Sequence, residues 1–165
     1  MRKLLGYILV LIFTALLPAC GDTQPQSSAG STIKAVIKTS TQAASLNVAA
    51  IDLTITVPAG VSPPLLADGT VDAANTVTII SSAASDQLLQ GATFTPATAT
   101  APGQLAIFGI IASGFTTSDE IIINLNIASG TFPTASDFNL LSFDAYDING
   151  APVTGLTPTL TTTIQ

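Results

Sequence analysis

Apolar and polar residues alternate with a period of two along most of the chain after residue 32, which is typical of half-buried β-strands. The pattern is clearest in residues 51–57 (IDLTITV), where large aliphatic residues occupy every second position. It recurs in residues 33–38 (IKAVIK) and 119–127 (DEIIINLNI). In the last of these, one face consists of large aliphatic residues: Ile121, Ile123, Leu125 and Ile127. All three segments are therefore predicted to be strands with one buried face.

Three further segments are predicted to be strands. Residues 77–80 (VTII) are short and β-branched, residues 105–112 (LAIFGIIA) are apolar on both faces and suit the middle of a packed sheet, and residues 156–164 form a Thr-rich final strand. Residues 91–104 are a low-complexity segment of Thr, Ala and Pro, in which the prolines exclude a central strand.

A last strand, residues 138–145 (FNLLSFDA), is predicted to contain an irregularity. Its apolar phase shifts between Leu140 and Leu141, and a β-bulge, which places two residues opposite one, produces such a shift. Residues 147–150 (DING) follow as a predicted turn, because Asn and Gly both tolerate the positive φ of a tight hairpin.

No segment shows a sustained helical period, although residues 81–90 are compatible with one helical turn or an irregular crossing. Short strands separated by Gly, Pro and Asn turns predict an all-β fold, an antiparallel two-sheet β-sandwich with jelly-roll or immunoglobulin-like topology. We expect one sandwich domain over residues 32–165, preceded by two segments of different character.

The first of these segments, residues 1–19, has the order of a secretory signal peptide. Arg2 and Lys3 are followed by an apolar run, residues 4–17, that is too short for a comfortable membrane span. The segment ends in Leu-Pro-Ala, directly before Cys20. Cys20 is the only cysteine of the chain, so no disulfide within the chain is possible.

The Leu-x-Ala-Cys sequence resembles the lipobox of bacterial lipoproteins. The resemblance implies that Cys20 becomes the mature N-terminus and carries two or three acyl chains, palmitate among them, that anchor the protein in the bacterial cell envelope. Gly21 rather than Asp follows Cys20, which by the same resemblance favours the outer membrane, at its periplasmic or outer face. An ordinary cleaved signal peptide with a Cys near its end is the alternative.

Residues 20–31 are predicted to link the lipid to the domain. Apart from Cys20 they carry no large apolar side chain, and ten such residues span roughly 18 Å as a flexible coil. The domain is therefore expected to float just off the bilayer.

Charge argues against a polyanionic partner. The chain has 4 basic and 10 acidic residues and a net charge of −6. Arg2 and Lys3 belong to the predicted signal peptide, so Lys34 and Lys38 are the cations of the mature protein. Two cations cannot neutralise a row of phosphates, which argues against nucleic acid, and an anionic membrane surface does not attract such a domain.

The groups that most enzymes use are missing from the sequence. The chain has no His, which removes Ser-His-Asp and Cys-His catalytic sites and His-based metal sites. Asp119 and Glu120 are adjacent, so on a strand they point to opposite faces and do not flank one bond. No glycine-rich phosphate loop precedes a helix, so no cofactor is indicated. A non-catalytic protein is expected.

Asp144, Asp147 and Asn149 are the candidate metal ligands, because oxygen ligands in a loop suit Ca²⁺. The alternative is a plain hairpin turn with solvated acids, since Asn149-Gly150 is also the strongest hairpin signal in the chain.

Four pieces of the sequence resemble the cohesin and carbohydrate-binding-module type of β-sandwich. They are residues 51–60, residues 103–108 leading into Ser113–Phe115, residues 120–127, and residues 138–156 (FNLLSFDAYDINGAPVTGL). The resemblance covers residues 32–165 and implies a cohesin-like protein-interaction or structural module with a protein partner. None of its motifs is a binding motif, so it assigns no binding residue.

A carbohydrate-binding module is the alternative function. Glycan binding relies on flat aromatic platforms, and after residue 19 the chain has no Trp and one Tyr, Tyr146. An exposed patch of Ile and Phe would favour a protein partner, whereas Tyr146 side by side with an exposed Phe would favour a glycan.

Overall fold

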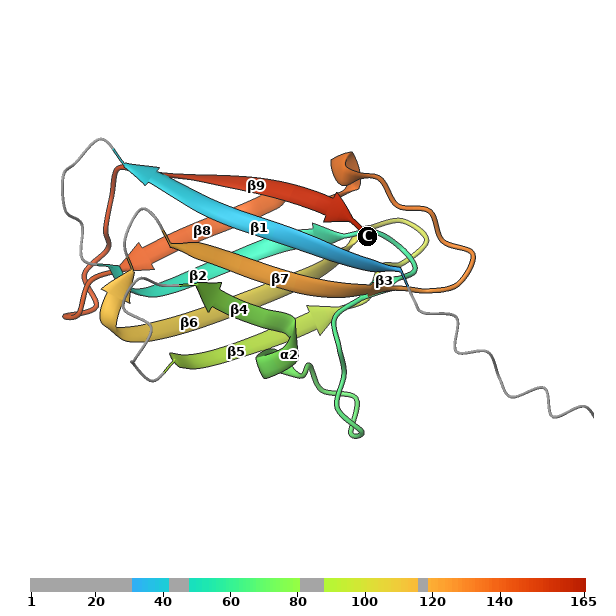
Figure 1. Cartoon of the computed structure of the whole chain (residues 1–165), viewed down its shortest axis with the longest axis horizontal. Coiled ribbons are helices and arrows are strands. Elements are labelled where there is room, and N and C mark those ends of the chain that lie inside the picture. The colour runs from blue at the N-terminus through green and yellow to red at the C-terminus, as the bar shows by residue number, and fades with distance from the viewer. Residues whose placement is uncertain (1–30, 42–47, 81–87, 116–118) are drawn as a thin grey trace, which may run out of the picture.

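The computed structural model describes residues 31–41, 48–80, 88–115 and 119–165, so the predicted signal peptide and Cys20 lie outside the described residues. Most of the described chain is β-strand (Figure 1). No helix among the described residues is long and apolar enough to cross a membrane. The elements are β1 (Thr32–Thr41), β2 (Val48–Val57), β3 (Val61–Ser62), α2 (Ala73–Thr76), β4 (Val77–Ile80), β5 (Leu88–Thr95), β6 (Gly103–Phe115), β7 (Glu120–Ile127), η1 (Ala135–Asp137), β8 (Leu140–Tyr146) and β9 (Leu156–Ile164).

The strands form two antiparallel sheets that pack face to face, which confirms the predicted two-sheet sandwich (Figure 1). The five-stranded sheet has the order β3-β7-β1-β9, and β4 pairs with β7 along the same edge as β3. The four-stranded sheet has the order β5-β6-β2-β8.

Along the sequence, the strands of each pair enclose those of the next, from β1 and β9 on the outside to β5 and β6 on the inside. β5 pairs with β6, β4 with β7, β2 with β8, and β1 with β9. In an immunoglobulin-type sandwich the first two strands share a sheet, whereas β1 and β2 lie in different sheets here. Of the two predicted topologies, the strand order therefore favours the jelly roll.

Aliphatic side chains that alternate along the inner strands form the core. The large side chains with at most 1% of their surface exposed are Ile33, Ile37, Leu53, Ile55, Val57, Leu105, Ile107, Ile123 and Leu125. On β7, Ile121, Ile123 and Leu125 are buried as predicted and Ile127 is partly buried, whereas Asn126 is exposed. Ile122, on the opposite face, is buried as well. The period-two pattern therefore identified the inner faces correctly.

The predicted irregularity in β8 is present. The register of β8 with β2 shifts between Ser142 and Leu140, and Leu141, which lies between them, is 52% exposed. The bulge thus accounts for the phase shift in the sequence.

The low-complexity segment, residues 91–104, contains the end of one strand and the start of another. Residues 91–95 form the second half of β5, which is an edge strand of the four-stranded sheet. β5 ends before Pro96 and β6 begins after Pro102, so neither proline lies in a strand. Gly103 and Gln104 nevertheless begin β6, an inner strand of the four-stranded sheet. Residues 88–90, which were predicted to be part of a helical turn or an irregular crossing, instead begin β5.

Candidate functional site

The outer face of the four-stranded sheet carries an apolar patch at its centre. The inner strand β6 turns Phe108 and Ile110 outward, because Leu105, Ile107 and Gly109 are buried on its other side. Phe108 is 47% exposed and Ile110 is 42% exposed. Side chains two positions apart on a strand are neighbours on one face, so these two form a continuous apolar surface.

Phe108 also lies over the neighbouring edge strand. Gly91 of β5 is directly opposite Phe108, and a Cβ atom built on Gly91 would overlap the Phe108 ring. The ring therefore covers the Gly91 backbone, where no side chain keeps it away from the sheet. An aromatic side chain over a cross-strand glycine is a known way to stabilise a sheet edge, and here it also holds Phe108 in place on the surface.

Two carboxylates continue the row from Phe108 across the sheet. Asp52 of β2 is opposite Phe108, and Asp144 of β8 is opposite Asp52; both aspartates are exposed. Directly opposed residues have Cβ atoms about 4.5–5.5 Å apart, and like charges at this separation destabilise a sheet. Neither carboxylate has an ion pair within the described residues; the ion pair found there joins Lys38 to Glu120 at 2.6 Å, on the other sheet.

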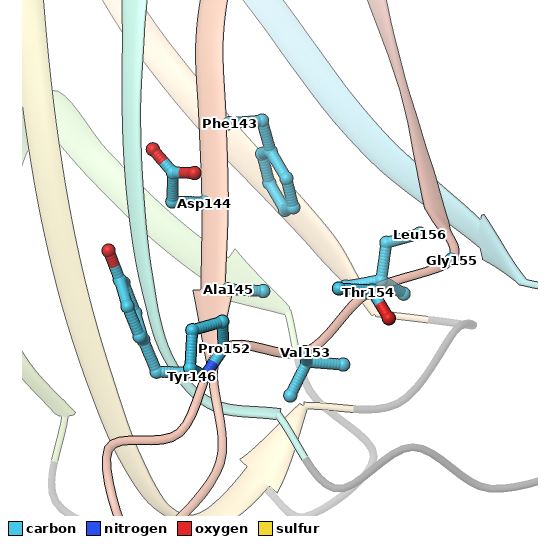
Figure 2. Close-up of a pocket in the computed structure, with 9 residues that line it drawn as sticks. All are labelled: Phe143, Asp144, Ala145, Tyr146, Pro152, Val153, Thr154, Gly155 and Leu156. Carbon is cyan, nitrogen blue, oxygen red and sulfur yellow. The ribbon is translucent and has the colours of Figure 1, made fainter.

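A hollow of about 370 Å³, lined in part by Asp144, lies at the outer edge of β8 (Figure 2). The chain returns along this edge, because the Val153 N–H donates a hydrogen bond to the Ala145 carbonyl at 2.8 Å. Figure 2 shows Asp144 and Tyr146 on one side of β8 and Phe143 on the other. The hollow thus combines aromatic, aliphatic and polar side chains around one strand edge.

The turn after β8 is closed by its own aspartate. Asp147 Oδ1 accepts hydrogen bonds from the backbone N–H of Ala151 at 2.8 Å and of Asn149 at 2.9 Å. These bonds, chiefly the one from Ala151, lower the pKa of the Asp147 carboxyl. Asp147 is therefore ionised at neutral pH, and the turn itself already uses one of its oxygen atoms.

Calcium binding by Asp144, Asp147 and Asn149 stays a prediction. Asp144 lies on the strand in the row with Asp52, while Asp147 and Asn149 lie in the turn. In the part of the chain that the structure describes, no three His, Cys, Asp or Glu side chains gather where they could hold a metal ion.

Because the turn closes through backbone hydrogen bonds to Asp147, we expect the domain to unfold at the same temperature with and without a calcium chelator. Differential scanning calorimetry in EDTA and in excess CaCl₂ measures this directly. A melting temperature that rises with calcium concentration would show that a bound ion stabilises the fold, and would make these three residues the first ligands to mutate.

The Asp52–Asp144 pair was not identified from the sequence, because which residues face each other across two strands depends on the register. Asp119 is buried and lies directly before β7, whose first residue, Glu120, is partly exposed. Cys20 lies outside the described residues, so its predicted acylation stays a prediction.

No protein-family model matches the chain, and neither the curated proteins nor the solved structures contain a match to it. Function is therefore inferred from the sequence patterns and from the surface geometry.

Proposed function

We propose that this chain is a lipid-anchored β-sandwich of the bacterial cell envelope that acts as a non-catalytic protein-interaction module. Its docking surface is the outer face of the four-stranded sheet. The observation that carries the proposal is the row formed by Phe108, Asp52 and Asp144, with Ile110 beside it. A complementary protein surface can pack on these exposed aromatic and aliphatic side chains and neutralise the charges beside them.

The face specifies the chemistry of its partner. A Lys or Arg side chain placed between Asp52 and Asp144 would relieve the repulsion between these carboxylates. Apolar side chains beside that cation would pack on Phe108 and Ile110, which β6 exposes on this face. Apolar anchors usually provide most of the affinity of an interface, and charges set its orientation and association rate.

The remaining parts of the proposal come from the sequence. The lipobox at Cys20 supports an acylated, envelope-anchored protein, and the cohesin-like segments support a module that works by being bound. The absence of His from the chain supports a non-catalytic role, since the usual nucleophile–base pairs cannot be assembled.

Replacement of Phe108 by Ser is expected to weaken partner binding by at least about tenfold, because it removes a central aromatic anchor. Asp52→Asn is expected to weaken binding and to flatten its dependence on salt, because one of the two attracting charges is lost. The test uses the acylated full chain in mild detergent. A partner captured by the wild-type protein is purified, and its affinity for each variant is measured by calorimetry.

Leu65→Ser is the matched control, because Leu65 is as exposed as Phe108, at 50%, but lies in the loop after β3. It should leave the affinity unchanged, and thermal unfolding of each variant verifies that it is folded. Full affinity in Phe108→Ser would place the partner elsewhere and reject this face as the docking surface.

One observation favours glycan binding as a second candidate. The hollow at the edge of β8 is lined by Tyr146 and Asp144 on one side of the strand and by Phe143 on the other, with Thr154 at its edge. Sugars bind against aromatic faces and hydrogen-bonding groups. Tyr146 is not beside Phe108, however, because it lies opposite Ala50 with β2 between the two. Specific retention on a glycan array that Tyr146→Ala abolishes would replace the protein partner by a carbohydrate.

A further inference from the structure

Phe132 has the most exposed large hydrophobic side chain among the described residues, with 90% of its surface accessible. It lies in residues 128–134 (ASGTFPT), the loop that connects β7 to η1. A single exposed apolar residue is common on protein surfaces, so its significance depends on how the loop is held and on what lies next to it.

The loop is held at both ends. The Thr131 side chain lies against Gly60, where a Cβ atom would overlap it, and Gly60 has a φ of +76° that favours glycine. On the other side of Phe132, the Thr134 N–H donates to Asp137 Oδ2 at 2.7 Å. Phe132 is therefore projected into solvent by an ordered loop rather than left exposed by a loose one.

The loop lies beside the start of the domain. The Ile127 N–H, at the end of β7, donates to the Ser31 carbonyl at 3.0 Å, and the Ala128 N–H donates to the Gly60 carbonyl at 2.8 Å. β1 begins at Thr32, so the chain enters the sandwich at the end where Phe132 projects. We call this end the tether end.

Two of the other loops at the tether end are uncharged. Residues 58–60 (PAG) and 96–102 (PATATAP) form a shallow hollow of about 310 Å³ lined by Pro, Ala and Thr. With the Phe132 loop they make an end surface whose three loops contain no Lys, Arg, Asp or Glu. The chain carries a net charge of −6, which includes Arg2 and Lys3 of the predicted signal peptide, so an anionic bilayer repels these three loops less than the acidic parts of the surface.

The geometry points to a membrane contact: Phe132 inserts into the headgroup–acyl boundary of the bilayer that holds the acylated Cys20, and so orients the sandwich on the membrane. This rests on the lipid anchor of the proposed function. A coil of about ten residues reaches roughly 18 Å, which keeps the tether end within reach of the surface. The domain then touches the bilayer with one loop instead of floating free of it.

The chemistry of the loop matches an interface rather than a protein pocket. An aromatic ring flanked by small, uncharged residues is suited to the boundary between headgroups and acyl chains. Hydrogen bonds from Thr134, the backbone bond first, lower the pKa of Asp137, which therefore stays charged and belongs in the aqueous headgroup layer. Ile148, 70% exposed in the turn after β8, lies at the opposite end of the sandwich, because β8 runs from η1 toward that end (Figure 1). A ten-residue strand such as β1 spans about 33 Å.

The chain has no Trp, so a single Trp reports its own surroundings. The acylated full chain with Phe132→Trp, and separately with Ile148→Trp, is reconstituted into vesicles of phosphatidylethanolamine and phosphatidylglycerol, with and without brominated phosphatidylcholine. Brominated acyl chains are expected to quench Phe132→Trp by at least about half, because an interfacial loop lies at the depth of the acyl boundary. Ile148→Trp should keep its emission.

A second measurement tests the native phenylalanine. Hydrogen exchange of the amides of residues 128–134 is expected to be slower in the vesicle-bound wild-type protein than in the vesicle-bound Phe132→Ser variant. Exchange in residues 147–151 should be the same in both. This comparison is independent of the tendency of an introduced Trp to seek the interface.

The possible results distinguish a failure of the lipid anchor at Cys20 from a failure of the membrane contact by Phe132. Failure of the full chain to float with the vesicles would overturn the lipid anchor, and the membrane contact with it. Flotation with equal quenching of the two Trp variants, or equal exchange in wild type and Phe132→Ser, would retain the anchor and overturn the contact, leaving Phe132 free to bind a protein.

Discussion

Ile123→Ala is expected to lower the free energy of unfolding by about 2–5 kcal/mol. Ile123 has 0% of its surface exposed and lies on β7, opposite Ala35 of β1 and Val77 of β4. Strands on both sides of β7 limit how far the structure can close over the lost atoms, so a cavity term adds to the lost burial. Urea unfolding followed by far-ultraviolet circular dichroism measures the change through its midpoint and slope.

Asn126→Ala on the same strand is the matched control. Asn126 is exposed, and surface substitutions usually change stability by less than about 0.5 kcal/mol. Asn124 is less suitable, because its Nδ2 donates to the Asn75 carbonyl at 3.2 Å. Similar losses in Ile123→Ala and Asn126→Ala would show that the inner and outer faces of β7 are assigned wrongly.

The strands and their buried faces were predictable because each depends on a short stretch of sequence. In residues 51–57 the alternation alone identifies Leu53 and Ile55 as core, and both have 0% exposure. The bulge at Leu141 was predictable for the same reason, since a phase shift in the apolar pattern has few structural explanations. Local composition was less informative for Gly91–Thr95, where the edge strand forms directly before Pro96 in a Thr- and Ala-rich segment.

The candidate site was not predictable from the sequence, because it depends on long-range register. Asp52 and Asp144 face each other only because β2 pairs with β8, and Phe108 joins their row only because β2 also pairs with β6. A shift of one residue in either pairing would turn these side chains toward the core. The role of Gly91 was not predictable for the same reason, because Gly91 lies under the ring of Phe108, which belongs to another strand.

Cys20→Ser is expected to abolish acylation and leave the chain as the unprocessed precursor. The chain has no other cysteine, and in lipoproteins of the kind that the lipobox resembles, cleavage follows lipid attachment. Stable anchoring by lipid needs more than one acyl chain, at about 0.8 kcal/mol for each buried methylene. The measurement combines metabolic labelling with a palmitate analogue and the apparent mass of the protein, because a retained signal peptide also partitions into detergent.

The position of the cysteine is tested by moving it. Cys20→Ser combined with Ser27→Cys keeps one cysteine in the same predicted linker but removes it from the Leu-x-Ala-Cys sequence. If the lipobox directs acylation, this variant behaves like Cys20→Ser, with no label and precursor mass. A Cys20→Ser protein of mature mass that still enters the detergent phase would show that the anchor is not the acylated cysteine. The orientation proposed for Phe132 would then lose its basis, whereas the docking face of the four-stranded sheet would stand independently.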